Sequence, residues 1–250
     1  NVFFGVALNT AVGIATQVQA AISQFVNSFT TALNPQITIS YAKKDMERMH
    51  SLICEGAKFS YFLLLLFALP IIIETPLILD LWLGNVPEYT IIFVRLSIIS
   101  SMVNILGNTP YTACMATGNI KKYAIWVTAV GSMAFFLTIP SYKIGLSPET
   151  FYWIYIIVYT FVLFVKLLLM KQMLSLSISK YVCSVLGRIV PVTIITFSVM
   201  GLFSYLIDPS IIRGVFTCIF SVLVWSLSVF AIGLTNTEQK LVINKLKSIL

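Results

Sequence analysis

Long apolar stretches alternate with short connectors that hold most of the charged residues of the chain. Seven of these stretches approach the ~20 residues that a helix needs to cross a hydrocarbon core about 30 Å thick. They are residues 13–33, 52–73, 90–118, 123–142, 151–170, 189–207 and 215–234. The pattern therefore predicts an all-α integral membrane protein with about seven transmembrane helices.

Assigning the connectors to alternate sides of a membrane divides the basic residues unequally. One side receives only Lys143 and Arg213. The other receives eleven of the 16 basic residues: Lys43, Lys44, Arg48, Lys121, Lys122, Lys171, Lys180, Arg188, Lys240, Lys245 and Lys247. Basic residues accumulate in cytoplasmic connectors. We therefore expect the chain to start outside the membrane and to end in the cytoplasm.

The composition excludes a soluble domain. The sequence is 58% hydrophobic and 10% charged with a mean hydropathy of +0.95, whereas soluble domains are about 25% charged. A basic rim beside anionic lipid headgroups explains the net charge of +7 without a nucleic acid partner. The four cysteines are isolated and form no cluster with histidine, which argues against a disulfide framework or a metal site.

Two of the apolar stretches carry a polar stripe at helical spacing. The first stripe consists of Gln17, Ala20, Ala21, Gln24, Asn27, Ser28 and Thr31. The second consists of Ser97, Ser101, Asn104, Asn108 and Thr112, and Gly107 and Pro110 interrupt its helix. Amides in lipid are costly unless they are paired or hydrated. The stripes therefore either line a translocation path or join helices through small residues and hydrogen bonds.

Two cations, Arg95 and Lys166, lie inside apolar stretches and are candidates for the same path. Glu88 is the expected partner of Arg95, because the two lie seven residues apart on nearly one helical face. Lys166 follows Tyr152, Tyr155 and Tyr159, which lie at helical spacing, so it ends an aromatic stripe. The alternative is that both cations reach the nearest membrane interface by snorkelling.

Nothing in the sequence predicts an enzyme or a cofactor. No apolar stretch has an Asp or Glu near its middle, and the single histidine, His50, lies in a charged connector region. Phosphate-binding loops and catalytic Ser/His/Asp sets are not recognisable.

Several short segments carry a resemblance to a known family. They are residues 9–29, 32–37, 40–43, 74–76, 81–83 with 86–88, 116–119, and 233–235 with Glu238 and Lys240. Together these segments resemble the Wzx-type polysaccharide flippases of the multidrug, oligosaccharidyl-lipid and polysaccharide (MOP) exporter superfamily. The resemblance extends over essentially the whole chain, although its motifs indicate the superfamily better than the substrate.

The resemblance implies a fold of two six-helix bundles around a central cavity that opens alternately to each side. Residues 1–175 would form the second bundle without its first helix, and residues 176–250 would add two helices and a cytoplasmic tail. A missing N-terminal half of the same protein would supply the first bundle. The first stretch would end at the Asn34–Pro35 pair, and residues 76–83 would form a short amphipathic outer segment.

The implied function is flipping of an undecaprenyl-diphosphate-linked oligosaccharide across the bacterial cytoplasmic membrane during O-antigen, capsule or exopolysaccharide biosynthesis. The substrate and membrane lipids would then be the partners of the protein. One alternative is a drug or lipid II exporter of the same fold, similar to the MATE transporters. Another is an integral O-antigen polymerase or ligase, although such enzymes are expected to have a large outer loop. A third is a purely structural membrane subunit, because a path lining and a packing interface use similar residues.

Overall fold

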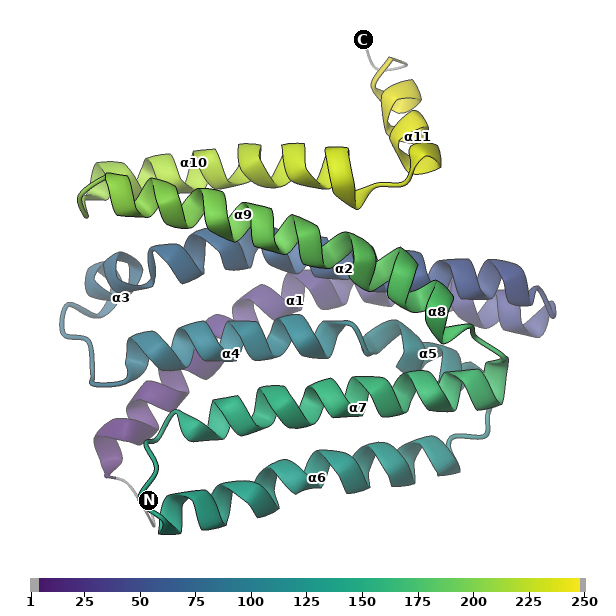
Figure 1. The fold of residues 1–250 in the computed structure, drawn as a ribbon, viewed down its shortest axis with the longest axis horizontal. Helices are drawn as coiled ribbons and strands as arrows, with labels where there is room; N and C mark the ends of the chain where they lie inside the picture. Colours follow the sequence, from purple (N-terminus) through teal and green to yellow (C-terminus); the bar gives the residue numbers. More distant parts are fainter. Residues whose placement is uncertain (1–4, 248–250) are drawn as a thin grey trace.

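The computed structural model describes residues 5–247, and this part of the chain is helical without strands (Figure 1). The side chains of Lys245 and Lys247 lie outside the described residues. In chain order the helices are α1 (Val6–Ala42), α2 (Met46–Ile73), α3 (Thr75–Leu83), α4 (Thr90–Ile105), α5 (Asn108–Ala116), α6 (Lys121–Lys143), α7 (Thr150–Leu174), α8 (Ile178–Tyr181), the π-helical turn η1 (Val182–Leu186), α9 (Gly187–Leu206), α10 (Ile211–Ser228), the π-helical turn η2 (Val229–Gly233) and α11 (Asn236–Lys247).

The long helices run back and forth along one direction and lie side by side (Figure 1). Helix α6 forms one edge and packs on α7, which packs on α4. Helices α1, α2, α4 and α5 contact one another in the centre, and the α9–α10 pair packs on α2 at the other edge. The central helices contain most of the core, for example Ile53, Leu65 and Phe93. The edge helices instead expose large apolar side chains such as Phe136 and Leu202, as expected for surfaces that face lipid.

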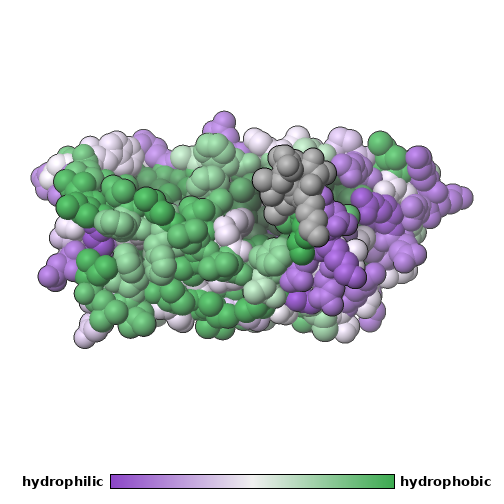
Figure 2. All heavy atoms as spheres, turned by 90° about the horizontal axis from the view of Figure 1, so that it is seen from above, coloured by the Kyte–Doolittle hydropathy of each residue, from purple (hydrophilic) through white to green (hydrophobic). Residues whose placement is uncertain are grey.

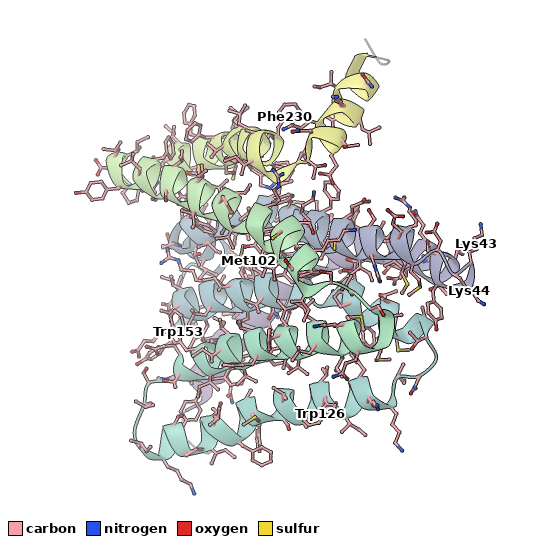
Figure 3. The ribbon with its side chains drawn as sticks, turned by 45° about the vertical axis from the view of Figure 1, so that its right-hand side comes forward. Lys43, Lys44, Met102, Trp126, Trp153 and Phe230 are labelled. Carbon is pink, nitrogen blue, oxygen red and sulfur yellow. The ribbon has the colours of Figure 1, made fainter. Side chains whose placement is uncertain are left out.

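Because successive helices alternate in direction, the connectors gather at two ends. We call the end with connectors 43–45, 117–120, 175–177 and 234–235 the basic end. Lys43 and Lys44 project from it (Figure 3), and hydrophilic side chains gather there, beside a broad apolar surface (Figure 2). The two-sided arrangement of the connectors that the charge pattern predicts is therefore confirmed.

Within the described residues, six helical segments are long and apolar enough to cross a membrane, by length and composition: Met46–Ile73, Thr90–Ala116, Lys121–Lys143, Thr150–Leu174, Ile178–Leu206 and Ile211–Gly233. Six of the roughly seven predicted membrane-spanning stretches are therefore confirmed by length and composition, and the first is not. Helix α1 has 37 residues, which is more than enough length. Its repeated Gln, Asn and Thr side chains lower its hydropathy below that of the other six segments.

The predicted end of the first helix at the Asn34–Pro35 pair is also wrong, because α1 continues through Pro35 to Ala42. An internal proline costs a helix about 3 kcal/mol. Here Ile37 and Ser40, which follow the proline, are both buried. Tertiary packing of this last part of α1 thus outweighs the local cost.

The short segment predicted at residues 76–83 is confirmed as α3, in which Pro76 occupies the first turn. At this end of the molecule, opposite the basic end, a buried ion pair joins α10 to the start of α3. Arg213 Nη2 lies 2.8 Å from Glu74 Oε2, and Thr217 Oγ1 donates to Glu74 Oε1 at 2.7 Å. Glu74 is 2% exposed, so the pair fixes α10 against the α2–α3 junction.

Candidate functional site

The predicted interruption of the third apolar stretch is confirmed as a break between α4 and α5 at Leu106 and Gly107. Pro110 has no N–H group, so the carbonyl of Leu106 lacks its usual helical donor. The hydroxyl of Tyr181, which is fully buried, donates to that carbonyl at 2.8 Å. Thr109 Oγ1 donates to the Ile53 carbonyl at 2.9 Å and ties α5 to α2. The break is therefore a fixed feature of the packing.

Lys166 of α7 packs directly against this break. A Cβ atom built on Gly107 would lie 2.6 Å from Lys166 Nζ and 3.0 Å from its Cδ. The absence of a side chain at Gly107 therefore makes room for the lysine. Among the described residues, the ion pairs are Lys58–Glu238 and Arg213–Glu74, and Lys166 belongs to neither. Lys166 is thus a partly buried cation with no carboxylate partner in the described part of the chain.

Two stacked tyrosines continue from Lys166 along α7. The rings of Tyr155 and Tyr159 are 4.0 Å apart between centroids with an interplanar angle of 21°. Asn104 Nδ2 donates to the Tyr155 hydroxyl at 3.2 Å. Asn104 and Tyr159 also line the narrow space around Lys166 and Gly107. The structure therefore brings the predicted aromatic stripe of α7 to the predicted polar stripe of α4.

On its other side, the polar stripe of α4 faces α1 across a recess of about 160 Å³. Asn27 from the first predicted stripe and Ser101, Asn104 and Asn108 from the second line this recess. Gln19 Nε2 donates to Ser101 Oγ at 2.8 Å and closes one part of it. We call this space, with its lining residues from α1 and from the α4–α5 segment, the polar recess.

Gln19 and Ser23 also line the polar recess, and the sequence reasoning missed both. They lie four residues apart, and Asn27 follows after another four, so the spacing that indicates a shared helical face was present. The predicted first stripe runs through Gln17 and Gln24 instead. Those two side chains are exposed on α1 and do not line the recess.

The exposed side of α1 is unusually polar for a helix in such an apolar bundle. Gln17, Gln24, Asn27, Ser28 and Thr31 are all exposed there. Phe25 also lies on the exposed side at 64% exposure, and its ring stacks on Phe67 at 5.3 Å. Uncovered amides are unfavourable against lipid. This face of α1 is therefore suited to water, a polar ligand or further protein.

Two of the predicted path residues have structural contacts elsewhere. Ser97 is buried, and its hydroxyl donates to the Val94 and Ala15 carbonyls. Arg95 does not pair with Glu88, contrary to the prediction, because its Nε donates to the Ile72 carbonyl at 3.0 Å. That carbonyl has no helical donor, since the residue four positions later is Pro76. Arg95 thus completes the end of α2.

Comparisons with known proteins identify no relative of this chain. No protein-family model matches it. No curated protein and no solved structure is significantly similar to it either. The resemblance to the polysaccharide flippases therefore rests on the sequence segments given above and on no wider match.

Proposed function

We propose that this chain is part of a transporter that flips a diphosphate-linked oligosaccharide on a polyprenyl lipid across the cytoplasmic membrane. The observation that carries the proposal is the convergence at the break between α4 and α5. Asn104, Tyr155, Tyr159 and Lys166 meet there, beside the polar recess. The face of the molecule in Figure 2 is largely apolar, and many large apolar side chains are exposed on the protein.

The chemistry of these groups suits the headgroup of such a lipid. Amide and hydroxyl groups replace the water that a sugar loses on entering a protein. Aromatic rings offer flat apolar faces for the C–H surfaces of a sugar, and a lysine ammonium forms charge-assisted hydrogen bonds with phosphate oxygens. The other two cations within the apolar stretches are already engaged: Lys58 in an ion pair and Arg95 with a backbone carbonyl. Just outside the stretches, Arg213 belongs to an ion pair and Arg188 donates to backbone carbonyls. Lys166, by contrast, forms no ion pair within the described residues.

The exposed polar face of α1 supports a translocation path that this part of the chain encloses only on one side. The polar recess lies between α1 and α4, and Asn27 belongs to both the recess and the exposed face. In the proposal, the rest of the path is completed on that face by further protein of the same transporter. The basic end would lie in the cytoplasm, in agreement with the bias of basic residues towards that side.

The test uses the Lys166→Gln variant in the full-length protein, with Lys171→Gln as the matched control. Lys171 is an exposed lysine in the last turn of the same helix. We expect Lys166→Gln to reduce surface glycan at least about tenfold at equal protein abundance, which corresponds to about 1.4 kcal/mol of lost phosphate interaction. Lys166→Arg should retain part of the activity, because the charge remains while the compact ammonium does not.

Normal surface glycan in the Lys166→Gln variant would remove Lys166 from the path. Normal surface glycan after deletion of the whole gene would reject the flippase proposal. Loss of drug resistance with unchanged glycan would favour the MATE-like exporter. Accumulation of unpolymerised glycan on the outer leaflet would favour a polymerase or ligase.

A further inference from the structure

A second cavity, of about 690 Å³, lies at the basic end between α2, the α8–η1 segment and α11. Helix α11 turns away from the direction of α10 (Figure 1), and its first residues form one wall of the cavity. We call this space the α11 cavity. It shares no lining residue with the polar recess.

Cationic side chains predominate in the α11 cavity. Lys58, Arg48 and Lys180 line it together with two carboxylates, Glu55 and Glu238. Lys58 is almost completely buried, because only 3% of its side chain is exposed. Glu55 is already engaged, since it accepts the hydroxyl of Ser51 at 2.5 Å. The arrangement favours an anion, because a buried lysine needs a negative partner to stay charged.

In this structure, Glu238 is the anion that neutralises Lys58. Lys58 Nζ lies 2.8 Å from Glu238 Oε1 and 2.6 Å from Oε2, so one ammonium holds both carboxylate oxygens. Glu238 also accepts the N–H of Thr235 at 2.7 Å, while its own N–H donates to Thr235 Oγ1 at 3.3 Å. This reciprocal pair is the capping box that starts α11. Burial raises the pKa of Glu238, but the hydrogen bonds from Lys58 and Thr235 lower it by more.

Among the side chains that the structure describes, few others hold helix α11 against the bundle. Beyond the Lys58–Glu238 pair, Gln239 Nε2 donates to the Phe230 carbonyl at 2.7 Å. Leu241, which also lines the cavity, remains 64% exposed. A ligand that replaced Glu238 on Lys58 would therefore free α11 without disturbing the core of the protein.

We propose that the α11 cavity binds a phosphate group, which displaces the Glu238 carboxylate from Lys58 and releases α11. Phosphate presents several oxygens to an ammonium, as the carboxylate does, and carries more charge. Arg48 and Lys180 supply further cations, and the hydroxyls of Ser51 and Ser184 also line the cavity. The phosphate comes either from the headgroup of an anionic lipid or from a soluble phosphate compound.

The test measures the distance between α2 and α11 in the full chain, reconstituted in phosphatidylcholine nanodiscs. Spin labels are placed on cysteines at Lys43, just before α2, and at Asn244, in a background where the exposed Cys183 and Cys218 are replaced by serine. One arm adds inorganic pyrophosphate, and the other includes phosphatidic acid in the nanodisc. A longer distance with pyrophosphate identifies a soluble phosphate ligand. A longer distance only with phosphatidic acid identifies a lipid headgroup.

The decisive variant replaces Glu238, whose carboxylate competes with the phosphate for Lys58. Because Glu238→Gln removes the internal anion, it should tighten binding of the active probe at least about tenfold. Glu47→Gln is the matched control, since Glu47 is an exposed carboxylate in the first turn of α2 and its loss changes the net charge equally. The double variant Lys58→Gln/Glu238→Gln leaves no unpaired charge and should abolish binding. The proposal is wrong if neither probe binds, or if Glu238→Gln behaves as Glu47→Gln does.

Discussion

Replacing Tyr181 by phenylalanine tests how the break between α4 and α5 is held. The substitution removes one hydroxyl and leaves the ring, so the packing around the fully buried side chain is preserved. The lost group is the donor to the Leu106 carbonyl at 2.8 Å. Pro110 has no N–H group to take its place. Tyr181→Phe should therefore leave a buried carbonyl without a partner.

The expected cost is about 1–3 kcal/mol, which is the penalty for an unsatisfied buried polar group. Side-chain hydrogen bonds in membrane proteins average nearer to ~0.6 kcal/mol, because alternative partners are often found. We expect a value above that average here, since the proline removes the nearest alternative donor. Tyr205→Phe is the matched control. Tyr205 lies on α9 at 86% exposure, so loss of its hydroxyl should leave the free energy of unfolding unchanged within ~0.5 kcal/mol.

The assay is an unfolding titration in mixed detergent micelles, read out by brief pulses of a thiol reagent. Cys54 and Cys114 are buried and become reactive on unfolding, provided that the exposed Cys183 and Cys218 are first replaced by serine. A sharper measurement repeats Tyr181→Phe in a Pro110→Ala background, in which residue 110 has an N–H group that can donate to the Leu106 carbonyl. In that background, Tyr181→Phe should lower the free energy of unfolding much less. An equal cost with and without the Pro110→Ala substitution would refute the reasoning.

Three further results are expected. In intact spheroplasts, an impermeant thiol reagent should label a cysteine introduced at Ser147 but not one at Asn119, and the reverse would overturn the proposed orientation. Glu74→Gln should destabilise the protein by about 3–5 kcal/mol in the same titration, because it removes the only carboxylate that pairs with Arg213 among the described residues, and the Arg213 side chain is only 10% exposed, whereas equal stability would show that the pair contributes little. Because the pKa of Glu238 lies below its ordinary value of 4.5, docking of α11 should be complete above pH 4.5 and lost on acidification below it; a spin-label distance independent of pH would contradict this.

The sequence predicts the helices of this protein better than it predicts their partners. Length and hydropathy place most of the membrane-spanning segments, because each segment satisfies its backbone hydrogen bonds internally. The polar stripe that begins in α4 was also predictable, since three of its members line the polar recess. The residues of α1 that face α4 were predicted only in part. Polar side chains surround much of α1, and periodicity alone does not say which side of the helix meets α4.

Contacts between distant segments lay beyond sequence reasoning. Lys58 and Glu238 are 180 residues apart, and no local pattern joins them. The partner of Arg95, by contrast, could have been predicted from the sequence. Pro76 necessarily frees the Ile72 carbonyl at the end of α2, and a free carbonyl near the membrane attracts a donor. Helical spacing favoured an ion pair of Arg95 with Glu88. In the structure, Arg95 instead donates to the Ile72 carbonyl, which needs a donor.

The same requirement explains how a chain with so many helix breaks stays ordered. The prolines at the start of α3 and in α5 each free a carbonyl, and a side chain from another helix satisfies it. Arg95 does this for Ile72, whose carbonyl also accepts the nearby Thr75 hydroxyl at 3.0 Å, and Tyr181 does it for Leu106. The breaks are therefore sites where helices are fastened together by hydrogen bonds. Lys166 packs against one of these fastened breaks yet makes no ion pair within the described residues. No ion pair of the described fold therefore depends on its ammonium.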